Sequence, residues 1–159
     1  MLPNIVENYV KIFKSLKIDF FMLSDLGCCG AIARDNGYAD DFESLKFNNV
    51  NLLKEKKVKH IVTNCGNCMQ TFALEYGIRT QHASQVIAEF LNKLPVKHEG
   101  EVSIYDSPNL LIYEEPRQIL DSLGFDVIDL ERNANFVPPH GALTDIAQME
   151  RSAAVFNSQ

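Results

Sequence analysis

The sequence contains no long hydrophobic run. No apolar stretch reaches the roughly 18 residues that a membrane-spanning helix needs. Residues 1–9 also lack the basic start and the long apolar stretch of a secretory signal peptide. Positive charge is scarce as well. The chain has 15 Lys and Arg against 21 Asp and Glu, which gives a formal net charge of −6. This balance argues against broad binding to nucleic acids or anionic membranes. We therefore expect a cytoplasmic protein without a membrane span.

Two common kinds of catalytic motif are missing too. The chain has no phosphate-binding glycine loop and no serine nucleophile motif. Its 159 residues are 46% hydrophobic and 23% charged, which predicts one domain or two closely packed halves with a real core. Only four residues are cysteines. Because cytoplasmic thiols are usually reduced, patterned cysteines there indicate metal or redox chemistry more often than structural disulfides.

Short β-rich runs alternate with helical patterns along the chain. This alternation predicts an α/β fold with largely parallel sheets flanked by helices. The predicted strands are residues 18–23, 60–63, 103–105 and 127–130. The predicted helices are residues 42–56, 69–76, 86–94 and 114–123, with a loop or broken helix at 25–41 and a last helix after a loop at 138–141.

An internal repeat divides the chain. Ser15–Leu23 resembles Ser122–Leu130, a helical pattern precedes each segment, and a loop containing Gly-Ala follows each one. We therefore predict two similar halves. Residues 1–97 form the half that carries the cysteines, and residues 98–159 form a degenerate, truncated second half.

The four cysteines form two pairs. Cys28 and Cys29 are adjacent, and Cys65 and Cys68 follow after 35 intervening residues. Each pair comes after a predicted strand, and sites in parallel sheets form at the carboxyl ends of strands. Thiolates are the standard ligands of iron–sulfur clusters and of closed zinc sites. We therefore predict that all four cysteines converge into one cofactor- and metal-binding site.

The spacing bears on which cofactor the site holds. A Cys-x-x-Cys at a strand-to-helix turn lets two sulfurs face one metal, with helix N-terminal amides stabilising the thiolates. Side chains of adjacent cysteines diverge, and a multi-iron cluster such as [4Fe–4S] tolerates this better than zinc does. The cluster is favoured and zinc is the alternative. Two other interpretations remain open: four reduced cysteines packed as small hydrophobic residues, or a thioredoxin-like redox pair at Cys65 and Cys68.

Histidines and one aspartate are further candidates. His140, in the loop of the second half, is either a ligand or proton donor facing the thiols or a solvated loop residue. His82 either caps the following helix or lines the cleft. His60 and His98 are expected to be structural or exposed, and Asp106 is either a site residue or a cap.

Cys28-Cys29-Gly30 and Cys65-Gly66-Asn67-Cys68 resemble the motifs of the cysteine-rich CCG-domain family. This family includes the cysteine-rich subunit of heterodisulfide reductase and the iron–sulfur subunits of glycolate and lactate oxidases. The resemblance extends to three further segments, at residues 82–85, 105–108 and 113–117. It implies a non-cubane [4Fe–4S] cluster ligated by five cysteines, replaced by zinc in some repeats. It also implies electron transfer or disulfide reduction within a larger complex.

The sequence departs from the family pattern at several positions. The family's leading cysteine would lie before Met1, and the opening cysteine of the second repeat is replaced within Ser107–Asn109. The second Cys-Cys-Gly has become Pro139-His140-Gly141, and no second Cys-x-x-Cys follows. We therefore expect one cluster with four of five thiolates and no second cluster.

These features together predict an iron–sulfur redox subunit. It would pass electrons or assist disulfide reduction, which makes it a possible oxidoreductase subunit. Its expected partners are other redox subunits of a heterodisulfide-reductase-like complex, and a homodimer is also possible. The alternatives are a zinc-binding structural subunit without turnover and a small thiol–disulfide oxidoreductase.

Overall fold

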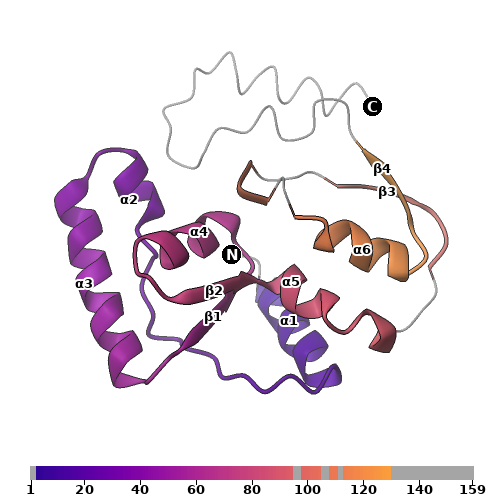
Figure 1. Ribbon diagram of the computed structural model, residues 1–159, viewed down its shortest axis with the longest axis horizontal. Coiled ribbons are helices and arrows are strands. Elements are labelled where there is room, and N and C mark those ends of the chain that lie inside the picture. The colour runs from indigo at the N-terminus through magenta and orange to yellow at the C-terminus, as the bar shows by residue number, and fades with distance from the viewer. Residues whose placement is uncertain (1–2, 95–97, 105–107, 111–112, 130–159) are drawn as a thin grey trace, which may run out of the picture.

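The computed structural model describes residues 3–94, 98–104, 108–110 and 113–129. Two strand–helix–strand units organise this part of the chain (Figure 1). The first comprises β1 (His60–Thr63), α4 (Gly66–Leu74) and β2 (Arg79–His82), and the second comprises β3 (Glu101–Ile104), α6 (Glu115–Ser122) and β4 (Asp126–Asp129). Within each unit the two strands pair in parallel, as a helical crossover requires. The predicted α/β fold with parallel sheets and flanking helices is confirmed.

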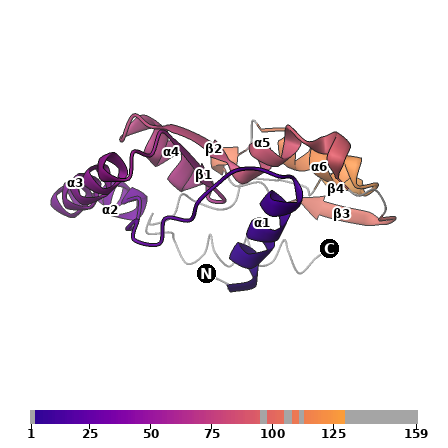
Figure 2. The same cartoon turned by 90° about the horizontal axis from the view of Figure 1, so that it is seen from below.

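The other helices surround the first unit. They are α1 (Pro3–Ser15), α2 (Ala31–Asp35), α3 (Ala39–Glu55) and α5 (Ala83–Ala88), with the short 3-10 turns η1 (Leu91–Lys93) and η2 (Pro108–Leu110). In both views α2 and α3 lie at one end of the molecule and the β3–α6–β4 unit lies at the other (Figures 1 and 2). The β1–β2 sheet lies between them. No helix in the described ranges is both long and apolar enough to cross a membrane.

The internal repeat appears in the structure as two helices that end alike. Lys17 follows α1 and Gly124 follows α6, both with positive φ, at 59° and 91°. The amide of Ile18 donates to the carbonyl of Phe13 at 3.0 Å, and the corresponding bond closes α6 at 3.1 Å. Both ends are therefore Schellman motifs, in which a left-handed residue satisfies the last carbonyls of a helix.

The prediction of a strand at residues 18–23 is wrong. The matching segment after α6 is β4, which pairs with β3 over four residues. None of the described strands pairs with residues 18–23, and Phe21 and Met22 are 63% and 61% exposed. An apolar run becomes a strand only where a neighbouring strand satisfies its amides and carbonyls. The loop that leads to the first cysteine pair therefore does not start from a sheet.

Two apolar clusters form the core. One joins α1 to α5 around Phe13, Leu16 and Ile87, with Ile119 of α6 packed against it. The other lies between α3, α4 and the β1–β2 sheet, and its buried members are Cys29, Ala31, Leu53 and Phe72. Two of the four thiols, those of Cys29 and Cys68, belong to this second cluster. The cysteine site is therefore built into the core of the first unit.

Candidate metal centre

Cys65 and Cys68 lie at the turn from β1 into α4. Cys65 is the N-cap of α4 in extended conformation, and Cys68 occupies its first turn. The amide of Cys65 donates to Thr63 Oγ1 at 3.2 Å, which holds the turn at the carboxyl end of β1. Both residues therefore lie at a helix N-terminus, whose dipole favours thiolate over thiol.

Cys28 and Cys29 lie in the loop before α2. Gly30 caps α2 with φ of 83°, and a Cβ there would lie 2.7 Å from the Phe42 ring, so the loop requires glycine at this position. The amide of Gly30 donates to Cys28 Sγ at 3.5 Å, and the amide of Ala31 donates to the sulfur of Cys29. Two backbone amides thus point at the two sulfurs.

Asn49 holds this loop against α3. Its Oδ1 accepts from the amide of Gly27 at 2.9 Å, and its Nδ2 donates to the carbonyl of Cys28 at 2.8 Å and to Tyr76 Oη at 3.2 Å. Tyr76 in turn donates to the carbonyl of Cys29 at 3.0 Å. No sequence motif singles out Asn49 or Tyr76. The available signal was position, because Asn49 lies on the face of α3 that also buries Phe42 and Leu53.

The closest thiols are those of Cys29 and Cys68. Cys68 Sγ donates to Cys29 Sγ across 3.2 Å. This hydrogen bond lowers the pKa of Cys29 to about 6, although burial acts in the opposite direction. The same bond raises the pKa of Cys68, because that thiol would have to release the proton it shares. Without a metal, the pair therefore holds one proton near neutral pH.

The other two thiols flank this pair. Cys65 is hydrogen-bonded to Cys68 through its side chain, and Cys28 is hydrogen-bonded to Cys29. Cys29 is 5% exposed, Cys65 and Cys68 are half-buried, and Cys28 is exposed. The structure thus brings together all four predicted residues, from the two loops that the sequence indicated.

The thiols are not arranged around a single point. In the described part of the chain, no three Cys, His, Asp or Glu side chains already surround a position for one metal ion. Two thiolates on one zinc, each about 2.3 Å from it, lie about 3.8 Å apart in a tetrahedral site. The 3.2 Å pair of Cys29 and Cys68 would open by a fraction of an ångström and release its shared proton. The donor set fits a thiolate-bound metal after this small adjustment.

His82 is a cap that also contacts the cysteine turn. Its Nδ1 accepts from the amide of Ser84 at 3.3 Å, and Gln85 Oε1 accepts from the amide of His82 at 2.9 Å, so the expected cap is confirmed. Burial lowers the pKa of His82, opposed by a hydrogen bond to the backbone of Asn64 and by the nearby Cys65 thiolate. His82 therefore ties α5 to the residue that precedes Cys65.

The remaining candidates do not join the site. His98 is exposed and stacks on Phe125, with ring centroids 5.0 Å apart, and His60 is exposed at the start of β1. Both agree with the expectation of structural or exposed residues. His140 and Asp106 lie outside the described residues.

Turn η2 packs against the site. A Cβ at Gly66 would lie 3.1 Å from Asn109 Cβ and 3.1 Å from Leu110 Cγ. This contact brings η2, in the segment where the opening cysteine of a second repeat was expected, onto the turn that carries Cys65. The glycine permits the close approach.

The chain's match to a known family agrees with this geometry. Residues 1–73 match the family model described as a cysteine-rich domain, CCG. This part of the chain is a CCG cysteine-rich domain. The match includes α1, both cysteine pairs and most of α4. The CCG domain therefore contains every thiol of the candidate centre.

One curated protein is a distant relative of the chain. It is an "uncharacterized iron-sulfur protein" of Methanocaldococcus jannaschii, 26% identical over 140 residues, which cover 82% of this chain. The chain spans 28% of that protein's length. No solved structure matches the chain.

Proposed function

We propose that the CCG domain holds an iron–sulfur cluster through Cys28, Cys29, Cys65 and Cys68 and passes electrons as a subunit of a larger redox assembly. The observation that carries this proposal is the convergence of four thiols from two separate loops, with a 3.2 Å contact between Cys29 and Cys68. The distant relative is named as an iron–sulfur protein, which supports the same cofactor.

The adjacent pair Cys28 and Cys29 favours a cluster over zinc. Side chains of consecutive residues diverge, which makes it hard for both sulfurs to bind a single zinc ion. A cluster distributes its thiolates over several irons and supplies reversible electron transfer when bound. The cysteine pattern therefore supports a [4Fe–4S] cluster over one zinc.

The chain's own residues would set the properties of the bound cluster. Amides of Gly30 and Ala31 point at sulfur, and such hydrogen bonds raise the reduction potential by stabilising the more negative state. Cys28 is exposed, so this side of the centre is open to a partner. We propose that other subunits of a heterodisulfide-reductase-like assembly donate or accept electrons there.

Metal analysis tests the cofactor. Protein purified without oxygen should be brown and contain about four irons per chain. Each of the four Cys→Ser variants should lose most of this iron, whereas Ser24→Ala, at an exposed site in the preceding loop, should keep it. One zinc per chain without visible absorption, unchanged by growth in iron-rich medium, would overturn the cluster.

A dithiol activity is a second candidate, favoured by the Cys29–Cys68 contact. The Cys29 thiolate would attack a substrate disulfide, and Cys68 would then displace the second substrate thiol, leaving a Cys29–Cys68 disulfide and two substrate thiols. An external dithiol would reduce the protein again. This function requires Cys29 and Cys68 but survives Cys65→Ser, unlike the alternative redox pair of Cys65 and Cys68 that the sequence left open. The two pairs are distinguished by measuring how fast the Cys→Ser variants reduce a small disulfide. Activity that survives Cys65→Ser but not Cys29→Ser supports the Cys29–Cys68 pair.

A further inference from the structure

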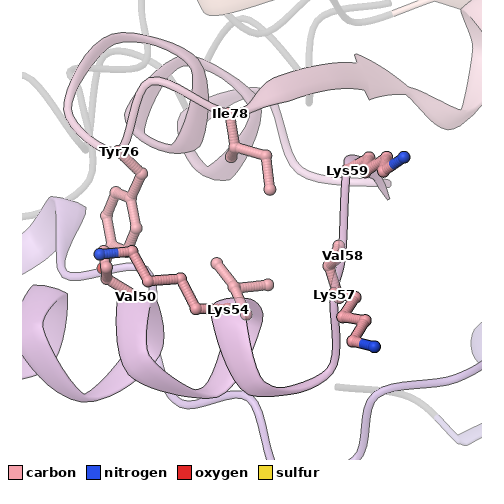
Figure 3. A pocket seen from close by; sticks show the side chains of 8 residues that line it. Val50, Lys54, Lys57, Val58, Lys59, Tyr76 and Ile78 are labelled. Atoms are coloured by element: carbon pink, nitrogen blue, oxygen red, sulfur yellow. The ribbon is translucent and has the colours of Figure 1, made fainter.

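A hollow lies beside the cysteine domain's core, where α3 ends and the two strands of the first sheet begin (Figure 3). Its volume is about 330 Å³, within the lower range of small-ligand pockets. The floor is apolar and is formed by Val50, Leu53, Val58, Tyr76 and Ile78. Such a surface favours a ligand with a hydrocarbon part.

Three lysines line the hollow, and no acidic residue of the described ranges does. They are Lys54, Lys57 and Lys59, all exposed. In Figure 3 the amine of Lys54 extends towards Tyr76, and Lys57 and Lys59 lie on the opposite wall with their amines directed outwards. Among the described residues, no acidic side chain forms an ion pair with any of the three. Three cations gather here in a chain of net charge −6.

The helix end alone does not account for these charges. Lys54 and Lys57 suit the negative end of the α3 dipole, but Lys59 lies past the helix, directly before β1. Lys57 has φ of 55°, a conformation in which glycine would be less strained. Lys17 occupies the equivalent position after α1 with φ of 59°, away from the hollow. This pair of lysines offers a matched experiment.

We infer that this hollow binds an organic carboxylate with an apolar body, such as a short acyl or aryl acid. The apolar floor would cover the hydrocarbon part, and the carboxylate would lie at the rim among the three ammonium groups. The lysine stems are long and flexible, so their amines can reach an anion from either wall. Charge and shape together select this class over neutral or purely ionic ligands.

The hollow shares a wall with the thiol site. Tyr76 lines it and donates through its hydroxyl to the carbonyl of Cys29 at 3.0 Å. Leu53, Val58 and Ile78 belong to the same apolar cluster as Cys29. A bound acid would therefore contact the layer that supports the cysteine loop. The binding itself does not depend on which cofactor the thiols hold.

Calorimetric titration of the purified full chain with three probes tests the inference. Hexanoate should bind at least about 10-fold more tightly than hexanol, which lacks the charge, and than acetate, which lacks the body. Raising the salt concentration should weaken hexanoate binding, because exposed charges are screened. Methyl NMR shifts should map to Leu53, Val58 and Ile78. Equal affinity for hexanol, or shifts confined to the α1–α5 core, would overturn the inference.

Variants separate binding from folding. Lys57→Gly removes a charge and also the backbone strain of a side chain at positive φ. The variant should therefore be at least as stable as the original protein and bind hexanoate about 3- to 5-fold more weakly. Lys17→Gly makes the same backbone change outside the hollow and should bind normally. The triple variant Lys54→Gln, Lys57→Gly, Lys59→Gln should lose the preference for hexanoate over hexanol, and a retained preference would contradict the assignment.

Discussion

Asn49 is a polar side chain on an apolar helix face, and its three hydrogen bonds explain why. It satisfies the amide of Gly27 and the carbonyl of Cys28 in a loop without regular secondary structure. Burying such groups without partners costs more than an apolar replacement gains. A single residue of α3 therefore fixes the conformation in which the first cysteine pair faces the second.

Replacing Asn49 with leucine should damage both the fold and the site. Asn49→Leu keeps a similar volume but leaves the loop groups unpaired, so we expect a loss of about 1–3 kcal/mol in the free energy of unfolding. Iron content should fall in parallel. Urea unfolding and metal analysis measure the two effects. Asn48→Leu, at the exposed neighbouring position, is the matched control and should change little. A stable Asn49→Leu protein with full iron would contradict this role.

The Cys29–Cys68 hydrogen bond gives the metal-free protein a measurable titration. Because the Cys68 proton stabilises the Cys29 thiolate, the pKa of Cys29 is about 6. Thiolate absorbance in reduced, metal-free protein should therefore show a step near pH 6 from Cys29. In Cys68→Ala the donor is absent, and this step should move to higher pH. Cys28→Ala removes the weakest stabilising contact of Cys29 and should move it much less.

The lowered pKa of Cys29 also makes the stability of the metal-free protein depend on pH. The folded-state pKa of Cys29 is lowered, so between about pH 6 and its unfolded value the unfolded chain binds more protons. The contribution of this contact to the free energy of unfolding is complete above the pKa of Cys29 in the unfolded chain. It is lost as the pH falls through about 6, the pKa of Cys29 in the folded protein. A Cys68→Ala protein should lose part of this pH dependence. A Cys29 step that stays near pH 6 in Cys68→Ala would show that another group lowers the pKa of Cys29.

At the scale of elements, η2 and α4 meet at Gly66. An alanine there would place its Cβ 3.1 Å from both Asn109 and Leu110. We expect Gly66→Ala to destabilise the protein by about 1–3 kcal/mol, because such overpacking forces neighbours to move. Urea unfolding measures the change. Leu110→Ala removes one of the two contacts, so the double variant should recover part of the loss, and strictly additive effects would show that the two residues do not interact.

The elements show what local sequence can and cannot predict. Strand β1 at residues 60–63 was predicted with its observed bounds, and α3 and α6 within a few residues, because each has strong periodicity and clear ends. Residues 18–23 looked like a buried strand but have no pairing partner among the described strands. Strand β2 was missed, since Arg-Thr-Gln-His shows no apolar alternation and pairs because β1 lies beside it. Strand formation depends on partners that one segment does not encode.

The candidate site shows the same limit at the scale of the molecule. The convergence of four cysteines could be predicted, because Cys-Cys-Gly and Cys-x-x-Cys motifs each mark a loop near a sheet edge. The predicted cause was partly wrong, since the first loop follows no strand and is held instead by Asn49 and Tyr76. Those contacts join residues 21 to 47 positions apart in sequence, so no local pattern reveals them. The division into halves at residue 97 stays a prediction.

Removing the metal should affect the two strand–helix–strand units unequally. Cys65 and Cys68 lie in the first unit and Cys28 and Cys29 lie in the loop before α2, whereas β3, α6 and β4 contain no cysteine. A ligand stabilises the parts that it orders in proportion to its occupancy. Chelation should therefore increase amide hydrogen exchange mainly in residues 26–31 and 64–69, with little change in 115–129. Mass spectrometry of exchanged peptides, with the Cys65→Ser protein as a metal-poor control, measures this pattern. Equal deprotection of both units would mean instead that the centre stabilises the whole molecule through the α5–α6 and η2 contacts.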